Sequence, residues 1–264
     1  MDIRFHNSKA WDHWVEKKSQ YTLPTSPEII AEAKLGNWDI HLTPTKSVPH
    51  SWMPDLHGKH VLCLASGGGQ QGPILSATGA IVTVLDNSPK QLEQDRYVAD
   101  REGLSLVTVE GDMRDLHVFQ DSSFDYVVNP VSNTFIPNVL PVWRETFRVL
   151  RFGGILIAGF GNPAVYLFDY KEVEHSGKLE VRYSIPYSDI NTLSEEEKAR
   201  YETECIPFEF SHTLEDQIGG QLKAGFTLID LYEDFENEND SNPLKEFMPL
   251  YISTRSKKLE PNLY

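Results

Sequence analysis

Cysteine is scarce in this 264-residue sequence, in which Cys63 and Cys205 are the only thiols. Two cysteines cannot build a framework of several disulfides or a cysteine zinc site. Long apolar runs are also missing, so no membrane-spanning helix is expected. The first residues lack the basic start and the apolar run of a signal peptide. We therefore expect a cytoplasmic protein.

Basic charge is the second shortage, because 24 Lys and Arg residues face 39 Asp and Glu residues, for a formal net charge of −15. Such an acidic chain is a poor electrostatic partner for nucleic acid phosphates or anionic lipid, so neither partner is expected. His57 and His60 are closely spaced, but no third type of ligand clusters with them, and no metal site is predicted. Hydrophobic residues make up 40% of the chain, enough for one large domain.

Short apolar runs alternate with helical patterns from about residue 59 onward. A helix is predicted to open at Ser88–Gln91 with an N-cap and a proline and to close at Gly103, and another covers 137–150. The predicted strands are 60–65, 81–85, 105–110, 124–129, 155–160, 227–232 and 250–254. Strands that alternate with helices indicate a parallel sheet covered on both faces.

A glycine-rich segment, Ala65-Ser66-Gly67-Gly68-Gly69-Gln70-Gln71-Gly72, directly follows the first predicted strand. Glycines in this place let a ligand approach the backbone where a Cβ atom would collide. Asp86 ends the second strand, where a carboxylate can meet the hydroxyls of a ribose. The pair predicts a nucleotide-type ligand, although Gly67-x-Gly69-x-x-Gly72 also fits the dinucleotide pattern. An ordinary glycine turn followed by a helix-capping aspartate is the alternative.

Three further motifs distinguish between these ligands: Gly111–Leu116, Phe124–Val127 and Leu150–Gly154. With them the chain resembles the class I S-adenosylmethionine-dependent methyltransferases, and most of all the small-molecule branch that includes the ubiquinone and menaquinone biosynthesis enzymes. The family patterns G-D-A-x-x-L, F-D-x-V and L-K-P-G-G correspond to these three segments in order. The family's D-L-G-C-G-T-G corresponds to residues 63–69. The likeness covers residues 58–160 well and the closing helix and hairpin moderately.

The resemblance implies an α/β fold with a doubly wound, seven-stranded, mostly parallel sheet, the Rossmann-like methyltransferase fold. Its strand order would be 3-2-1-4-5-7-6, with the last strand antiparallel. An N-terminal helical cap and an insertion after the fifth strand would be added to it. The corresponding ranges are a cap and linker (1–57), a cofactor-binding core (58–162), a substrate-side insertion (163–210) and a closing helix and hairpin (211–264).

The resemblance also implies how S-adenosylmethionine would be bound. The glycine loop would pass under its methionine part and ribose, Asp86 would hold the ribose hydroxyls and Asn87 would flank the adenine. Asp112 would accept a hydrogen bond from the adenine amino group, with Met113 against the ring. The implied cofactor-binding residues are Ala65, Ser66, Gly67, Gly69, Gln70, Asp86, Asn87, Asp112, Met113, Asn129 and Pro130.

Asn129 and Pro130 would lie beside the sulfonium, near the transferred methyl group. Cys63 stands where the family has an acid that helps to anchor the cofactor's amino group, so another residue must take that role. Asn129-Pro130 also faintly resembles the start of the N-P-P-[YF] signature of enzymes that methylate bases or glutamine amides. The second proline and the aromatic residue are absent, and a nucleic acid methyltransferase is not expected.

The candidates on the substrate side are Trp11, Trp14, Tyr21 and Asn133. The three aromatic residues either pack in the core or cover the cofactor cleft, and both interpretations stay open. We expect methyl transfer to a small-molecule acceptor. No catalytic base is identified from the sequence. The oligomeric state, monomer or homodimer, is left open. The alternatives are a nicotinamide-dependent oxidoreductase and a cofactor-binding protein with a degenerate methyltransferase fold.

Overall fold

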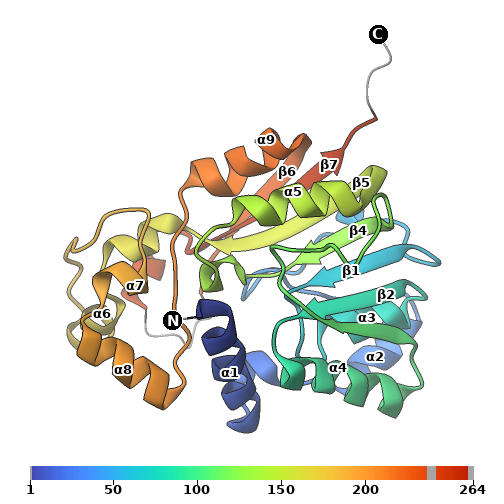
Figure 1. Cartoon of the computed structure of the whole chain (residues 1–264). Coiled ribbons are helices and arrows are strands. Elements are labelled where there is room, and N and C mark those ends of the chain that lie inside the picture. The colour runs from blue at the N-terminus through green and yellow to red at the C-terminus, as the bar shows by residue number, and fades with distance from the viewer. Residues whose placement is uncertain (1, 237–241, 261–264) are drawn as a thin grey trace.

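The computed structural model describes residues 2–236 and 242–260, so the range predicted as 211–264 lies partly outside the described residues. One seven-stranded sheet forms the centre of the molecule, in the order β3-β2-β1-β4-β5-β7-β6 (Figure 1). The strands are β1 (His60–Leu64), β2 (Ile81–Asp86), β3 (Leu106–Glu110), β4 (Phe124–Asn129), β5 (Leu150–Gly161), β6 (Phe226–Asp234) and β7 (Tyr251–Lys258). The strands β1 to β5 pair in parallel and β7 runs antiparallel to both of its neighbours. The expected fold class and strand order are confirmed.

Helices cover both faces of the sheet, with α2, α3 and α4 on one side and α5 and α9 on the other (Figure 1). Three further helices, α6, α7 and α8, belong to the stretch between β5 and β6, and α1 is the N-terminal helix. The helices are α1 (Ile3–Glu16), α2 (Pro27–Lys34), α3 (Gln71–Ala77), α4 (Pro89–Glu102), α5 (Leu140–Val149), α6 (Tyr170–Ser176), α7 (Asp189–Thr192), α8 (Glu195–Glu204) and α9 (Gly220–Ala224).

Local signals in the sequence explain where several of these elements begin and end. The Ser88 hydroxyl accepts a hydrogen bond from the Gln91 backbone N–H (3.1 Å) at the start of α4, and Gly103 ends that helix with a φ of +64°. Asp2 caps α1 by accepting from the Phe5 N–H (3.1 Å), which sets the start of this helix. The Thr213 hydroxyl accepts from the Asp216 N–H (3.0 Å), and a π-helical turn follows over Glu215–Gly219.

Two apolar layers result from the alternation of side chains along the central strands. Val61 and Cys63 of β1 face the layer under α2, α3 and α4, whereas Leu62 and Leu64 face the layer under α5. Cys63 is fully buried between Val84 and Val128 of the neighbouring strands. Burial raises the pKa of its thiol, so Cys63 is a neutral core residue.

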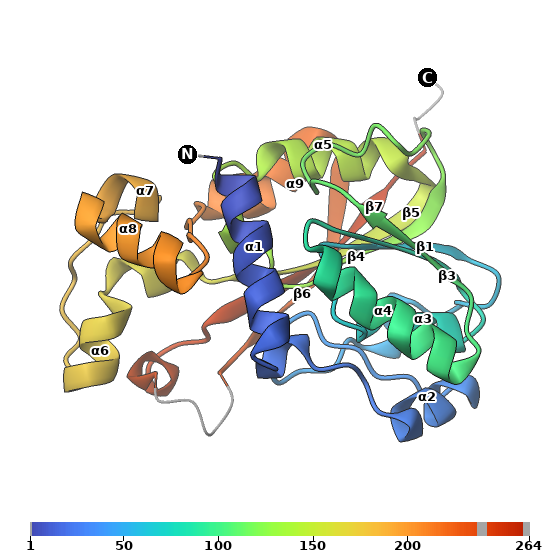
Figure 2. The same ribbon diagram turned by 60° about the horizontal axis from the view of Figure 1, so that its bottom comes forward.

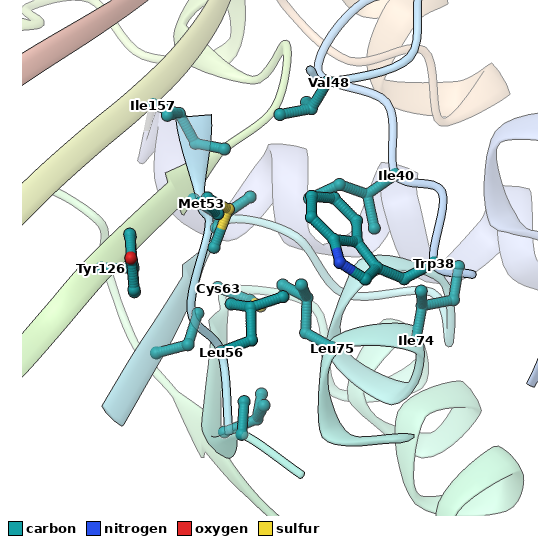
Figure 3. Packing of buried hydrophobic residues seen from close by; sticks show 14 of the residues in the cluster. Trp38, Ile40, Val48, Met53, Leu56, Cys63, Ile74, Leu75, Tyr126 and Ile157 are labelled. Carbon is teal, nitrogen blue, oxygen red and sulfur yellow. The ribbon is translucent and has the colours of Figure 1, made fainter. Parts of the chain in front are cut away.

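The proline-containing stretch over 43–58 contributes to the first of these layers. Its prolines prevent regular hydrogen bonding, but the apolar side chains between them still pack onto the sheet. Figure 3 shows them beside Cys63 and Leu75. The buried side chains of this stretch and of the residues just before it are Trp38, Ile40, Leu42, Val48, Trp52, Met53 and Leu56.

The N-terminal helix and the insertion lie together beside the sheet. In both views α1 stands between α4 and the group formed by α6, α7 and α8 (Figures 1 and 2). The insertion has a small core of its own around Tyr201, Phe208 and Phe210, against which Ile3 of α1 packs. The stretch that looked irregular in sequence therefore contains short helices packed around aromatic residues.

Ala65 occupies a backbone conformation that favours glycine, with a φ of +47°. This conformation costs a non-glycine residue about 1–2 kcal/mol, whereas a new glycine costs about 0.4–1 kcal/mol through the entropy of the unfolded chain. We expect Ala65→Gly to raise the free energy of unfolding in urea by about 0.5 kcal/mol.

The matched control is Ala99→Gly within α4, where the backbone is helical. It is expected to lower the free energy of unfolding by about 1 kcal/mol. Equal destabilisation by the two substitutions would contradict the assignment of strain to Ala65.

Candidate functional site

The glycine loop is held by two carboxylates. The Gly67 N–H donates to Asp86 Oδ2 (2.9 Å), and the Gly68 N–H donates to Asp95 Oδ2 (3.1 Å). Gly68 and Gly69 have φ values of +114° and +73°. The loop therefore folds back onto the end of β2 and onto the first turns of α4.

The need for glycine in this loop comes from the protein itself. A Cβ atom on Gly67 would lie 2.7 Å from Gln91 Cβ, and one on Gly69 would lie 2.8 Å from the Gln94 carbonyl oxygen. The sequence interpretation assigned this need to a bound ligand, but close packing of the loop against α4 already requires it at both positions.

Asp86 lies at the carboxyl end of β2, enclosed by protein but still partly accessible. Its Oδ1 accepts from the Ser88 N–H (2.9 Å), and its Oδ2 accepts from Gly67. Burial raises the pKa of Asp86, and the N–H groups of Ser88 and Gly67 only partly offset this. Each carboxylate oxygen has two lone pairs, so Asp86 can cap the turn and still accept from a ribose hydroxyl.

Asp112 is joined to Arg114, a residue that the sequence analysis did not single out. The guanidinium donates from Nη2 to Asp112 Oδ2 (2.6 Å), and the Arg114 N–H donates to Oδ1 (2.9 Å). Burial alone would raise the pKa of Asp112, but the hydrogen bonds from Arg114 outweigh it and the pKa is lowered. Asp112 is thus an ionised acceptor beside the buried side chain of Met113.

Asn129 and Asn133 are completely buried at the carboxyl end of β4. Asn129 Nδ2 donates to the Leu64 carbonyl (3.0 Å) and to the Ser132 hydroxyl (2.9 Å), while its Oδ1 has no hydrogen-bond partner. Asn133 Nδ2 donates to Gln217 Oε1 (3.1 Å), and its Oδ1 is also without a partner. Pro130 beside them is partly exposed.

Several buried oxygens around the glycine loop and the end of β4 share this lack of a donor. They belong to the side chains of Asn87, Gln91, Asn129 and Asn133. A buried acceptor without a partner costs about 1–3 kcal/mol, which indicates a ligand rich in donors. S-adenosylmethionine has such donors in its adenine amino group, ribose hydroxyls and ammonium group, and the residues present therefore fit it.

A buried acid on α4, Asp95, holds the glycine loop from the side of that helix. Asp95 is fully buried and accepts from the N–H groups of Gly68 and Gly69. Burial raises the pKa of Asp95 well above its usual value, and its carboxyl also raises the pKa of Cys63. The sequence offered no signal for this role, because an aspartate in a polar helix is normally exposed to solvent.

The N-terminal segment covers the loop and is bonded to it. Asp12 of α1 accepts from the Ser88 hydroxyl (2.6 Å) and from the Lys90 N–H (3.1 Å). The Thr25 N–H donates to the Gly69 carbonyl (2.9 Å), closing the segment onto the loop from the other side. Residues 8–25 therefore form a cap over the glycine loop, and we use this name for them below.

The aromatic residues of this cap are partly exposed rather than buried in the core of the sheet. Trp11 contacts Trp14 and Phe135 edge to face, with ring centroids 4.9 and 5.1 Å apart. Trp14 stacks on Tyr21 at 6.5 Å. They join the cap to the turn that follows β4, and their contact with substrate stays a prediction.

The comparisons with known proteins agree with this geometry. A family model described as a methyltransferase domain matches residues 62–158. An uncharacterized methyltransferase of Bacillus subtilis, YbaJ, is 52% identical over 254 residues, which are 96% of this chain and 98% of that protein. The chain belongs to the class I S-adenosylmethionine-dependent methyltransferases.

Solved structures and more distant relatives support the same fold. A methyltransferase from Mesorhizobium loti matches with a TM-score of 0.60 at 16% identity, over 79% of this chain and 94% of that one. One from Methanosarcina mazei gives 0.60 at 18%, over 81% and 99%. A sterol 24-C-methyltransferase of Gibberella zeae is 33% identical over 135 residues, half of this chain and 34% of that protein.

Family membership decides against one of the sequence-based alternatives. The enzyme uses S-adenosylmethionine and is not a nicotinamide-dependent oxidoreductase. None of the helices within residues 2–236 and 242–260 is long and apolar enough to cross a membrane.

Asp86 provides a direct test of the cofactor site. We expect Asp86→Ala to weaken the binding of S-adenosylhomocysteine by about 1.5–3 kcal/mol, because a charge-assisted hydrogen bond is lost and its partner is left unpaired. Isothermal titration calorimetry measures this change. Asp100→Ala, at an exposed position of α4, is the control and should keep native affinity. Native affinity in Asp86→Ala would remove Asp86 from the site.

Asp12 tests whether the cap holds the cofactor in place. Removing its carboxylate frees the Ser88 hydroxyl and the Lys90 N–H, so Asp12→Ala should bind S-adenosylhomocysteine about tenfold more weakly, the scale of one lost hydrogen bond to a charged group. Trypsin should also cleave faster after Lys17 and Lys18. The exposed Asp39→Ala is the control. Faster cleavage with unchanged affinity would show that the cap and the cofactor are independent.

Proposed function

We propose that this enzyme transfers a methyl group from S-adenosylmethionine to a small-molecule acceptor held between the start of α5, the start of α1 and the 163–210 insertion. The observation that carries the proposal is a hollow of about 530 Å³ where these three parts meet. Its size falls within the range of small-molecule sites, about 300–1,000 Å³.

The lining of this hollow is suited to an organic molecule with a few polar groups. Apolar and aromatic side chains such as Ile3, Tyr187 and Phe210 supply most of the wall, while Asn138 and His212 add polar atoms. Burial lowers the pKa of His212, so this side chain is neutral at physiological pH. The lining holds neither Lys nor Arg, which argues against a nucleic acid acceptor.

The names of the relatives support an acceptor of this kind. Besides the sterol 24-C-methyltransferases, a 2-methyl-6-phytyl-1,4-hydroquinone methyltransferase of rice is 36% identical over 106 residues, 38% of this chain and 29% of that protein. The chain spans only about a third of these proteins' length, so their acceptors indicate a class and not an identity.

The chemistry asks mainly for positioning. S-adenosylmethionine, when bound, supplies an electrophilic methyl group, and the protein must align an acceptor atom with it and exclude water. Asp86 and Asp112 would hold the ribose and adenine ends. Asn129 Oδ1 would accept from the ammonium group, the role left open by Cys63. The cap and the insertion would close the site from outside.

The test follows the transfer of a tritium-labelled methyl group. We expect S-adenosylhomocysteine, but not NAD, to raise the melting temperature, because a ligand that binds only the folded state stabilises it. We also expect label to appear in methyl-1,4-hydroquinone or in another member of a panel of phenols, sterols and amines. Transfer to RNA or DNA alone would contradict the proposal. Cofactor binding without transfer to any acceptor would favour the degenerate, binding-only alternative.

A further inference from the structure

A cluster of hydroxyl and carboxyl groups joins the ends of β4 and β5 to the insertion. Tyr166 lies in the 3₁₀ turn Pro163–Leu167, directly after β5. Its hydroxyl donates to Glu209 Oε2 (2.7 Å) and contacts the Thr134 hydroxyl. Thr134 belongs to the turn Asn133–Phe135 that follows β4. Three separate segments thus bring these side chains together at the carboxyl edge of the sheet, where open α/β sheets bind ligands.

The cluster is next to the hollow that we assign to the acceptor. Tyr187 lines the hollow, and its ring stacks on that of Tyr166 with centroids 5.4 Å apart. Tyr166 and Glu209 are surrounded by protein, yet each keeps part of its surface accessible, as expected for residues that line a cavity. Phe135, beside Thr134, contacts Trp11 of the cap. The cluster therefore adjoins the acceptor hollow through Tyr187 and the cap through Phe135.

The charged groups that face Glu209 are acidic. Its own N–H donates to Asp189 Oδ2 (2.7 Å), and the other oxygen of Asp189 accepts from the Tyr187 hydroxyl (2.8 Å). On the side of α1, the His6 ring packs at a tilt against Phe208, the residue before Glu209, with centroids 4.6 Å apart. None of the hydrogen bonds or ion pairs within the described residues joins Glu209 to a lysine or arginine.

Protonation of the cluster follows from this setting. Burial raises the pKa of Glu209 to about 7, with Asp189 adding to the rise and the Tyr166 hydroxyl opposing it. Burial, together with the nearby charge of Glu209, raises the pKa of Tyr166 well above its usual value. Tyr166 therefore stays protonated, while Glu209 exchanges its proton near neutral pH, where a general base is most effective.

We propose that Tyr166 and Glu209 form the proton acceptor of the methyl transfer, with the Tyr166 oxygen facing a hydroxyl of the acceptor and Glu209 behind it. The inference rests on the small-molecule acceptor proposed above and narrows it to one that carries a hydroxyl. Attack by the acceptor oxygen forms an O–C bond, and the C–S bond breaks with its electron pair left on sulfur. The acceptor proton passes to Tyr166 as the phenol proton of Tyr166 passes to Glu209. Opening of the site then returns the proton to water.

The alternative role of this cluster is to hold the insertion in place. Activity decides between the two roles through its pH dependence. Glu209 accepts a proton only when it is ionised, so kcat should rise with pH as one group titrates near pH 7 and then level off. A structural carboxylate gives no such rise.

The experiment measures kcat and KM for methyl-1,4-hydroquinone between pH 5 and 9 in four proteins. Glu209→Gln should lower kcat by about 100-fold and abolish the rise, because a positioned base contributes about 10²–10⁴-fold. Tyr166→Phe should also lower kcat and leave KM nearly unchanged. Glu202→Gln, on the exposed side of α8, is the control and should match the wild type. Affinity for S-adenosylhomocysteine and the circular dichroism spectrum should be native in all four.

A second measurement does not depend on the acceptor. Infrared spectra of the S-adenosylhomocysteine complex should show a protonated carboxyl band that disappears near pH 7 and is absent from Glu209→Gln. A band that disappears well below pH 5, or a rise of kcat that persists in Glu209→Gln, would overturn the assignment of the base. Transfer only to acceptors without a hydroxyl would overturn the proposed role of Tyr166 and Glu209 and leave the small-molecule function in place.

Discussion

The structure depends most on one arrangement, the binding of backbone N–H groups of the glycine loop by two carboxylates. Asp86 reaches Gly67 from the end of β2, and Asp95 reaches Gly68 from within α4. These bonds hold the loop in one position between the first strand and the helices. Burial raises the pKa of both acids, because enclosing a carboxylate in the protein costs free energy. The hydrogen bonds from the loop offset part of this cost.

Hydrogen bonds connect this loop to the segments that cover the site. The cap binds the loop through Thr25 and the start of α4 through Asp12, and the insertion binds α1 through Asn7, whose Nδ2 donates to the Phe208 carbonyl (3.0 Å). The insertion in turn meets the end of β5 at Tyr166. A single connected set of polar contacts therefore links the cofactor loop to the residues beside the acceptor hollow. A displacement of the cap would therefore affect both the cofactor loop and the residues beside the acceptor hollow.

The two halves of the site place different demands on charge. Around the loop, the acids accept hydrogen bonds from the backbone and leave buried oxygens free for the donors of the cofactor. Around Glu209, acidic neighbours and burial leave a carboxylate that can exchange a proton. The acidic net charge of −15 is thus reflected in the site, which is rich in hydrogen-bond acceptors for donor-rich ligands.

The sequence by itself determined what local patterns can encode. Apolar runs gave the strands, Ser88 and Gly103 gave the limits of α4, and the motifs up to Leu150–Gly154 gave the family and its cofactor. Tertiary structure decided the rest, because the partners are far apart in the chain. Asp95 and Gly68 are 27 residues apart, Tyr166 and Glu209 are 43 apart, and no local spacing signals either pair. The apolar residues among the prolines of 43–58 were likewise visible, but only the folded sheet shows that they cover it, because burial is a property of the whole chain.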